Sequence, residues 1–388
     1  MRVALLRGDS LNRYEMQSYE PLLSEWELVA FTSWDNTFDL NGMRIPVRRL
    51  HAYTEFLRIL PARLRRYGDY AVRHVLEIHM PFVQLVRQLK GFDIVHTADA
   101  HYFYSYQAIQ AKKRYDNKVV VTQWENIPFL FERRRGARRR KQETLKHADA
   151  FVAITERAKE ALILEGVPAG KIRVIPMGID LFRFRPAARD AALAAALGIH
   201  SSDKVILYAG RLVRSKGLFE LFYAFSRLLC DLNGSGDAVK LVCVGSGNAL
   251  ALKPMLLRLG LAERVIFAGN FSYDEMPKIH NLADVFVLPS VPTYRWQEQF
   301  GMVLVESMAC GKPIISTMSG SIPEVVGDAG VLVQPYDHLA LYQALRKLLL
   351  DSSSRARLGQ KGRARAEAHF DCRQVAMRLS EVYRSLFA

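Results

Sequence analysis

Cysteine is scarce in this sequence and is nowhere clustered. The four cysteines, Cys230, Cys243, Cys310 and Cys372, lie far apart, and no pair has the spacing of a metal site. No Asp-x-Asp sequence occurs, and no His, Cys and carboxylate residues gather with metal-ligand spacing. The pattern argues against a disulfide framework and indicates a reduced protein. It also predicts a site that works without a bound metal or other cofactor.

The sequence also lacks long apolar runs, and it has fewer acidic than basic residues. No apolar run approaches the roughly 20 residues that a membrane-spanning helix needs. Residues 1–8 have the pattern of a buried strand and its turn, not that of a signal peptide. The 388 residues carry 54 Lys and Arg against 39 Asp and Glu, a formal charge of +15. We therefore expect a cytoplasmic protein with anionic partners, which include nucleic acid, acidic lipid and phosphorylated substrates.

Two basic stretches in the first half of the chain bear on the choice among these partners. Residues 56–67 mix apolar and basic side chains, and residues 133–141 form a dense basic block. No aromatic residues interleave with the block, so base stacking is not indicated, which argues against a nucleic-acid partner. Each stretch fits a solvated helix as well as a helix on anionic lipid. The second interpretation places the protein peripherally on the inner face of the membrane.

Apolar segments of strand length alternate with helical patterns along the whole chain, in two series. This alternation predicts two consecutive doubly wound α/β domains. Residues 183–186 have the character of a linker, which gives domains 1–185 and 186–371. Thr155 is expected to cap a helix over 156–164. The last expected helix, 371–387, follows an Arg-rich stretch that has the character of a turn. The expected strands are 1–6, 27–32, 92–96, 119–122, 150–154 and 171–176, then 204–209, 240–244, 265–269, 284–290 and 313–316.

The stretch from residue 284 to residue 316 is the most informative one. A buried strand over 284–290 leads through a loop to a helix over 301–310, and Pro313 opens another strand. Gly311 occupies the position that commonly ends a helix. The loop between strand and helix lies at the carboxyl end of a strand, where open α/β sheets bind ligands.

Two glutamates in this stretch are candidate ligand-binding residues. Glu298 lies in the loop, and Glu306 lies eight positions later, about 12 Å along a helix. Glu306 could accept hydrogen bonds from ribose hydroxyls, and Glu298 from the hydroxyls of a second sugar. The backbone N–H groups of Phe300, Gly301 and Met302 would bind an anion between them. The alternative is an ordinary amphipathic helix with two solvated glutamates.

Other loops at strand ends supply further candidates. Arg211 and Lys216 flank a Gly-bounded loop before a helix, a setting that suits a diphosphate. Gly8, Gly245 and Asn270 follow other predicted strands and are candidate ligand contacts on this weaker ground. His96, Trp124 and Glu125 follow buried strands of the first series, and polar and aromatic residues in that position suit a binding site.

Several of these segments together resemble retaining glycosyltransferases of family 4. The resemblance is carried by residues 210–217, 283–290 and 298–313, by Ile322-Pro323-Glu324-Val325, and by Pro176-Met177-Gly178-Ile179-Asp180. It implies the GT-B fold, in which two Rossmann-like domains face each other across a cleft. It also implies that residues 372–388 cross back to the first domain.

The resemblance further implies roles for the candidate residues. Glu298 would bind the transferred sugar, Glu306 the nucleotide ribose, and Arg211 and Lys216 the diphosphate. Three further candidates, Gly8, Gly245 and Asn270, would join the donor site. The acceptor side would include His96, Trp124 and Glu125. The reaction would be metal-independent, with front-face attack and the leaving phosphate as base. The donor would be a UDP-, GDP- or ADP-sugar, and the acceptor a glycan, a lipid-linked or a small hydroxyl compound in surface polysaccharide or glycolipid synthesis.

The sequence departs from the family pattern on the acceptor side. One glycine, Gly8, stands where many members have two, Gln123-Trp124-Glu125 where a His is common, and Met177 where Asn is common. Two other classes stay open at this point. One is a different nucleotide-sugar enzyme of the same fold, such as an epimerase, and the other is a basic nucleic-acid-binding protein.

Overall fold

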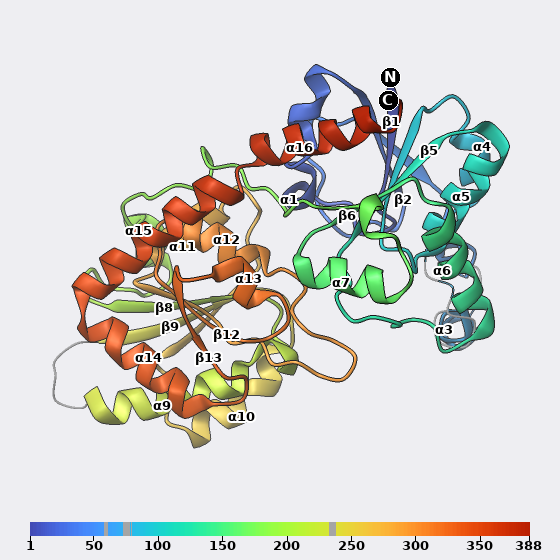
Figure 1. The fold of residues 1–388 in the computed structure, drawn as a ribbon. Coiled ribbons are helices and arrows are strands. Elements are labelled where there is room, and N and C mark those ends of the chain that lie inside the picture. Colours follow the sequence, from blue (N-terminus) through green and yellow to red (C-terminus); the bar gives the residue numbers. More distant parts are fainter. Residues whose placement is uncertain (58–60, 73–77, 79, 233–237) are drawn as a thin grey trace. The chain divides into compact units, whose positions relative to one another are not determined.

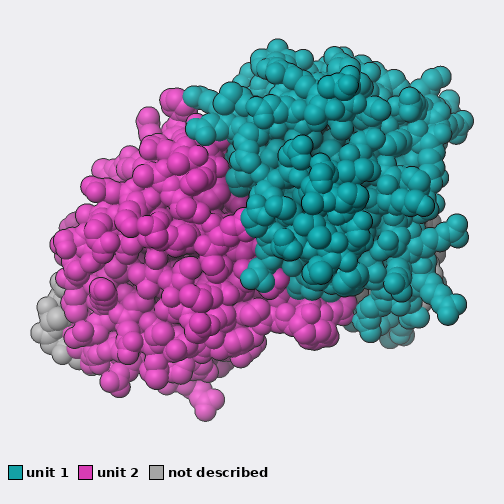
Figure 2. All heavy atoms as spheres, viewed as in Figure 1, with its two compact units in different colours: residues 1–178, 372–388 teal, residues 179–371 magenta. Residues whose placement is uncertain are grey.

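The computed structural model describes residues 1–57, 61–72, 78, 80–232 and 238–388. The chain forms two compact units, shown in Figures 1 and 2. Unit 1 comprises Met1–Gly178 and Cys372–Ala388, and unit 2 comprises Ile179–Asp371.

The units divide after residue 178, earlier than the expected boundary after residue 185. Ile179 pairs with Asp371 and donates its N–H to the carbonyl of Phe370 at 2.6 Å. Phe184 is fully buried, and its carbonyl accepts a hydrogen bond from Arg363. The residues that were expected to form the linker therefore pack as part of unit 2. The C-terminal helix α16 (Cys372–Ser385) belongs to unit 1.

The described strands of unit 1 form a seven-stranded parallel sheet in the order β3-β2-β1-β4-β5-β6-β7. The chain order reverses between β1 and β4, so the carboxyl ends of these two strands mark the switch point where such sheets bind ligands. The strands are β1 (Arg2–Leu6), β2 (Glu27–Ser33), β3 (Val47–Leu50), β4 (Ile94–Ala98), β5 (Lys118–Gln123), β6 (Ala150–Ala153) and β7 (Ile172–Val174). The helices besides α16 are α1 (Arg13–Met16), η1 (Glu20–Ser24), α2 (Tyr53–Leu57), α3 (Ala62–Tyr70), α4 (Leu85–Gln88), α5 (Phe103–Tyr115), α6 (Arg135–His147), α7 (Glu156–Leu164) and η3 (Ala169–Lys171).

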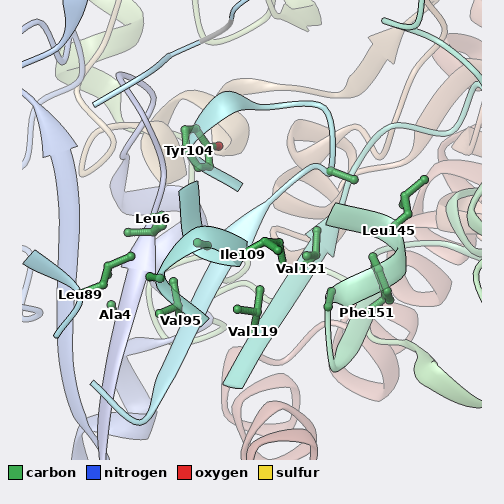
Figure 3. Close-up of a cluster of buried hydrophobic side chains, with 14 of the residues drawn as sticks. Ala4, Leu6, Leu89, Val95, Tyr104, Ile109, Val119, Val121, Leu145 and Phe151 are labelled. Atoms are coloured by element: carbon green, nitrogen blue, oxygen red, sulfur yellow. The ribbon is translucent and has the colours of Figure 1, made fainter. Parts of the chain in front are cut away.

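Apolar side chains cover both faces of the unit 1 sheet, as expected for a parallel sheet between helices. Successive residues of β1 alternate: Ala4 and Leu6 join one buried cluster, Val3 and Leu5 the other. The first cluster, shown in Figure 3, contains residues of α4, α5, α6 and α7. The second contains residues of α1, η1 and α16. The C-terminal helix therefore completes the core of unit 1.

Unit 2 has the same architecture. Its described strands form a six-stranded parallel sheet in the order β10-β9-β8-β11-β12-β13, with the reversal between β8 and β11. The strands are β8 (Lys204–Ala209), β9 (Val239–Val244), β10 (Val265–Gly269), β11 (Val285–Leu288), β12 (Ile314–Thr317) and β13 (Gly330–Val333). The helices are α8 (Ala191–Ala196), η4 (Arg214–Lys216), α9 (Leu218–Leu232), α10 (Ala249–Arg258), α11 (Met276–Leu282), α12 (Met302–Ala309), α13 (Ile322–Val326), α14 (His338–Leu350) and α15 (Ser352–His369).

Several local predictions are confirmed and one is wrong. Thr155 caps α7 by accepting the N–H of Ala158, and α12 runs between Gly301 and Cys310 as its caps. The Arg-rich stretch before the last helix is not a turn but the helix α15, whose arginines bond backbone carbonyls of neighbouring segments. Of the basic stretch 56–67, residues 58–60 lie outside the described residues. Within the described part of the chain, every helix is too short or too polar to cross a bilayer.

Candidate active site

The loops that follow β8 and β11 come together at the switch point of unit 2. The two strands are hydrogen-bonded neighbours, so their carboxyl ends lie at the same edge of the sheet. Gly217, with φ +73°, ends the loop after β8, and a Cβ at this position would lie 1.7 Å from the carbonyl oxygen of Pro289. Only glycine allows this close approach. The approach sets Lys216 beside the residues that follow β11.

Lys216 and Glu298 form the central contact of this edge. The ammonium group lies 2.6 Å from Glu298 Oε2, and the hydroxyl of Ser290 donates to the same oxygen at 2.7 Å. The Lys216 ammonium also lies 4.8 Å from the centre of the Trp296 ring. Because both charged side chains are nearly buried, each holds the other in position. A lysine has three N–H donors, so Lys216 can bind Glu298 and an anion together.

Arg211 lies in the same loop but faces solvent. Its carbonyl accepts a hydrogen bond from the hydroxyl of Tyr208 at 2.7 Å, which holds the backbone at the end of β8. Its side chain is exposed and forms no ion pair with a described residue. Arg211 can therefore offer its guanidinium group to an anion without giving up another partner.

The N-terminus of α12 adds backbone donors to the same edge. Gly301, with φ +84°, is the N-cap, and no side chain from the described residues caps this helix. Leu304 N–H bonds the carbonyl of Gly301 at 2.8 Å, so Met302 and Val303 carry the remaining donors of the first turn. The Phe300 ring is 1% exposed and packs edge-on against Phe370. Phe300 thus contributes its side chain to the core of unit 2.

Glu306 lies inside α12 and is held by a residue that sequence reasoning missed. The Nε2 atom of His280, from α11, lies 3.0 Å from Glu306 Oε2, and both side chains are buried. The rings of Phe184 and Phe286 flank the imidazole. Glu306 Oε1 forms no hydrogen bond with a described residue and can accept one from a hydroxyl group. The only sequence signal for His280 was a lone histidine on a short helix.

The three candidates with weaker signals occupy different settings. Gly245 donates its N–H to the carbonyl of Gly269 at 2.9 Å, and a Cβ on it would lie 2.2 Å from the carbonyl oxygen of Gly210. Asn270 is exposed directly after β10. Gly8 lies in unit 1, where a Cβ would lie 2.2 Å from Met80 Sδ. Close packing against backbone thus accounts for the glycine at position 245, and a left-handed φ of +64° accounts for the glycine at position 8.

The acceptor-side prediction for His96 is wrong. His96 is a residue of β4 itself and is fully buried. Its Nδ1 bonds the Tyr383 hydroxyl at 2.6 Å, and its Nε2 bonds Thr122 Oγ1 at 2.7 Å. Burial holds the pKa of this imidazole well below its usual value, so the ring is neutral. Both nitrogens serve the core and neither can contact a ligand.

Trp124 and Glu125 do follow β5, but a second missed residue organises them. Asp99, after β4, has φ +45° and accepts the N–H groups of Trp124 and Glu125 at 2.8 and 3.0 Å. Glu125 in turn accepts the N–H groups of Asn126 and Ile127. Burial raises the pKa of the Asp99 carboxyl to about 7. Its position directly after a buried strand was the signal that could have identified it.

Comparison with known proteins identifies the family. A model described as Glycosyltransferase Family 4 matches residues 44–183, and one described as Glycosyl transferases group 1 matches residues 190–365. A D-inositol 3-phosphate glycosyltransferase of Xylanimonas cellulosilytica is 32% identical over 314 residues, which cover 75% of this chain and 72% of that protein. The chain belongs to glycosyltransferase family 4.

Other family 4 relatives match over a smaller share of their length. A D-inositol 3-phosphate glycosyltransferase of Corynebacterium jeikeium is 33% identical over 256 residues, 63% of this chain and 59% of that protein. The chain spans about half the length of several further relatives of the same name.

Solved structures show the fold along the whole chain. HepE from Anabaena, solved with UDP and glucose, has a TM-score of 0.79 at 20% identity and covers 99% of this chain and 100% of its own. Sucrose-phosphate synthase from Thermosynechococcus elongatus has a TM-score of 0.74 at 22% identity and covers 100% and 99%. This family 4 chain therefore has the GT-B fold, with two parallel-sheet α/β domains.

Proposed function

We propose that this family 4 glycosyltransferase is a retaining enzyme that moves a hexose from a nucleoside-diphosphate sugar to a hydroxyl acceptor. The acceptor would be a glycan, a lipid-linked compound or a small molecule in surface polysaccharide or glycolipid synthesis. The observation that carries this proposal is the Lys216–Glu298 contact at the switch point of unit 2. It joins a cation suited to a phosphate with a carboxylate suited to sugar hydroxyls.

Each of the candidate residues would bind a different part of the donor. Glu306 would bind the ribose hydroxyls, and Arg211, Lys216 and the first N–H groups of α12 would bind the diphosphate. Glu298 would bind the transferred sugar. As the glycosyl–phosphate bond breaks, the two cations would stabilise the charge that grows on the leaving diphosphate. A phosphate oxygen would take the proton of the acceptor hydroxyl as it attacks from the same face.

The comparisons favour particular substrates for the first tests. HepE was solved with UDP-glucose, which favours a UDP-sugar donor over GDP- and ADP-sugars. The names of the relatives favour an inositol phosphate among the small acceptors. No step in this proposal requires a metal, so activity should survive a chelator.

A donor and acceptor screen tests the proposal. Thermal shift and hydrolysis with UDP-, GDP- and ADP-sugars identify the donor, and transfer to D-inositol 3-phosphate or extracted glycolipid identifies the acceptor. NMR of the product determines whether the anomeric configuration is retained. Donor consumption that yields only an isomerised nucleotide sugar would favour an epimerase instead. Retention of duplex DNA that weakens with salt, without donor binding, would favour a nucleic-acid-binding protein.

We also propose that unit 1 docks on an anionic membrane, which would give a lipid-linked acceptor access. Exposed cations precede and continue along α6 at Arg133, Arg134, Arg135, Arg138 and Arg139, and α3 adds Arg63 and Arg66 beside the exposed Leu64 and Tyr67. Lys141 takes no part, because its side chain is buried. Each basic side chain near such a surface contributes about 1 kcal/mol. Equal recovery of the protein with neutral and acidic vesicles in flotation at low salt would contradict this proposal.

A further inference from the structure

The loop between β11 and α12 contains a small hairpin that closes at Trp296. The N–H of Thr293 donates to the carbonyl of Trp296 at 2.7 Å, and the N–H of Trp296 donates back to the carbonyl of Thr293 at 3.4 Å. Tyr294, at the tip between them, is 89% exposed. The two reciprocal hydrogen bonds fix where the hairpin closes, so the backbone of Trp296 has a defined position.

Two neighbouring loops of unit 2 hold the base of this hairpin. The N–H of Val291 donates to the carbonyl of Ser215, in η4, at 2.9 Å. The hydroxyl of Tyr336, which follows β13, donates to the carbonyl of Pro292 at 2.6 Å. Tyr336 has a φ of +68°, in a backbone region that bulky residues rarely adopt. Such strain persists only where the surrounding structure enforces it, so the hairpin is anchored on both sides.

Trp296 presents its ring to the ammonium group of Lys216. The ammonium nitrogen lies 4.8 Å from the ring centre, which is within the range of a cation–π contact. The Lys216 side chain is 13% exposed, and such contacts gain strength when the cation is shielded from water. Glu298 holds the same ammonium group through the 2.6 Å ion pair. An aromatic ring and a carboxylate therefore fix Lys216 together.

The two contacts make different demands on the ammonium group. The ion pair uses one of its three N–H donors. At 4.8 Å the ring attracts the charge without accepting a hydrogen bond, so the other donors stay available to phosphate oxygens. A lysine side chain is long and flexible, and ordering it costs rotamer entropy. A ring that holds the ammonium group in advance lowers the part of this cost that falls on ligand binding.

We infer that Trp296 is a positioning residue for Lys216, whose ammonium group its ring holds at the place where the leaving diphosphate gains charge. The inference rests on the proposed function, which assigns the diphosphate to Lys216. Trp296 acts through Lys216, so its effect on diphosphate binding disappears when Lys216 is removed.

A double-mutant cycle on the full chain tests this inference. Calorimetry with UDP, GDP and ADP, which carry the charge of the leaving group, measures the affinities of wild type, Trp296→Ala, Lys216→Ala and the double variant. We expect Trp296→Ala to weaken the best-bound nucleotide about three- to tenfold. In the Lys216→Ala background the same substitution should change the affinity by less than about twofold.

Two further variants distinguish an aromatic face from simple apolar packing. Trp296→Phe keeps a ring that attracts the ammonium group, whereas Trp296→Leu keeps an apolar side chain without one. We expect Trp296→Phe to retain most of the wild-type affinity and Trp296→Leu to bind as weakly as Trp296→Ala. Tyr294→Ala is the matched control, because it removes the exposed ring at the tip of the same hairpin, and it should bind like wild type.

Three outcomes overturn the inference. They are equal affinity of the Trp296→Ala and wild-type proteins, equal affinity of the Trp296→Phe and Trp296→Leu variants, and an effect of Trp296→Ala that persists at full size without Lys216. Each of them leaves the proposed function intact, since the wild type still binds a nucleoside diphosphate. Failure of the wild type to bind all three nucleotides would instead reject the donor site, and the role of Trp296 with it.

Discussion

Lys216 and Glu298, 82 positions apart in the sequence, form a 2.6 Å ion pair within unit 2. Each residue comes from the loop after a different strand, and β8 and β11 are neighbours in the sheet. The pair is largely shielded from water, so its geometry is tightly defined before any ligand arrives. It therefore provides the first test of the proposed chemistry.

Replacing Lys216 or Arg211 with alanine should lower turnover more than it raises the KM for the donor. Their interaction strengthens as the leaving diphosphate gains charge, and such groups typically contribute on the order of 10²–10³-fold in kcat. Arg214→Ala is the matched control, because Arg214 is an exposed cation of the same loop that pairs with Glu220. Initial rates at saturating donor measure the effect. Unchanged turnover in both variants would reject the assignment.

Substitutions of Glu298 and Glu306 should have different effects, because Glu298 is expected to bind the sugar and Glu306 the nucleotide. Glu306→Ala removes the proposed ribose partner and should weaken nucleoside diphosphate and full donor alike, by about 1.5–3 kcal/mol. His280→Ala should act in the same direction, because His280 holds the Glu306 carboxylate. Glu298→Ala should leave nucleoside diphosphate affinity nearly intact and reduce transfer steeply.

The Glu298→Gln variant tests the nature of that last effect. It should restore little transfer if the charge of Glu298 stabilises positive charge on the sugar, and much of it if Glu298 only orients hydroxyls. Calorimetry with nucleoside diphosphate measures nucleotide affinity, and initial rates of the same variants measure sugar transfer. Together they show which glutamate serves which part of the donor. If Glu298→Ala reduced the affinity for nucleoside diphosphate as much as Glu306→Ala, with the fold intact by circular dichroism, the two roles would be wrongly assigned.

Asp99 should make unit 1 less stable as the pH rises. Burial raises the pKa of its carboxyl from 3.8 to about 7, so the folded state binds this proton more tightly than the unfolded chain. The resulting stabilisation is full below pH 3.8 and is lost as the pH rises to about 7. Asp99→Asn cannot ionise. Relative to wild type it should therefore gain stability over this range, on the order of a few kcal/mol.

Urea unfolding of both proteins at about pH 4.5 and 7.5 measures this difference. Asp116→Asn is the control, since Asp116 also has a left-handed backbone, with φ +59°, but is exposed. Asparagine tolerates that backbone region, so neither substitution adds strain. Parallel stability curves for wild type and Asp99→Asn would contradict the prediction.

Tyr383→Phe should destabilise unit 1 without affecting the donor site. The substitution keeps the ring that packs against Trp26 and removes the hydroxyl that bonds His96 Nδ1 at 2.6 Å. A buried imidazole nitrogen left without a partner costs about 1–3 kcal/mol. Met377→Ala, at a largely exposed position of the same helix, should cost much less. Denaturant midpoints measure the loss of stability, and UDP calorimetry checks that the donor site is unaffected.

Elements defined by local pattern were predictable from the sequence. The helix between Gly301 and Cys310 and the Thr155-capped helix follow from apolar spacing and capping chemistry, which depend on residues within a few positions. The buried strands and the two-domain α/β organisation follow from the same periodicity. The membership in glycosyltransferase family 4 also follows from motifs that are contiguous in the chain.

The tertiary structure decided which side chains could act. His96 and Asp99 both stand near the end of one strand, yet His96 is sealed in the core by Tyr383, 287 positions away, and Asp99 organises the neighbouring loop. The pairing of His280 with Glu306 and the contact of Trp296 with Lys216 likewise depend on distant elements. Burial and partners of this kind arise only when the sheet brings remote segments together, because local periodicity indicates which face is apolar but not what packs against it.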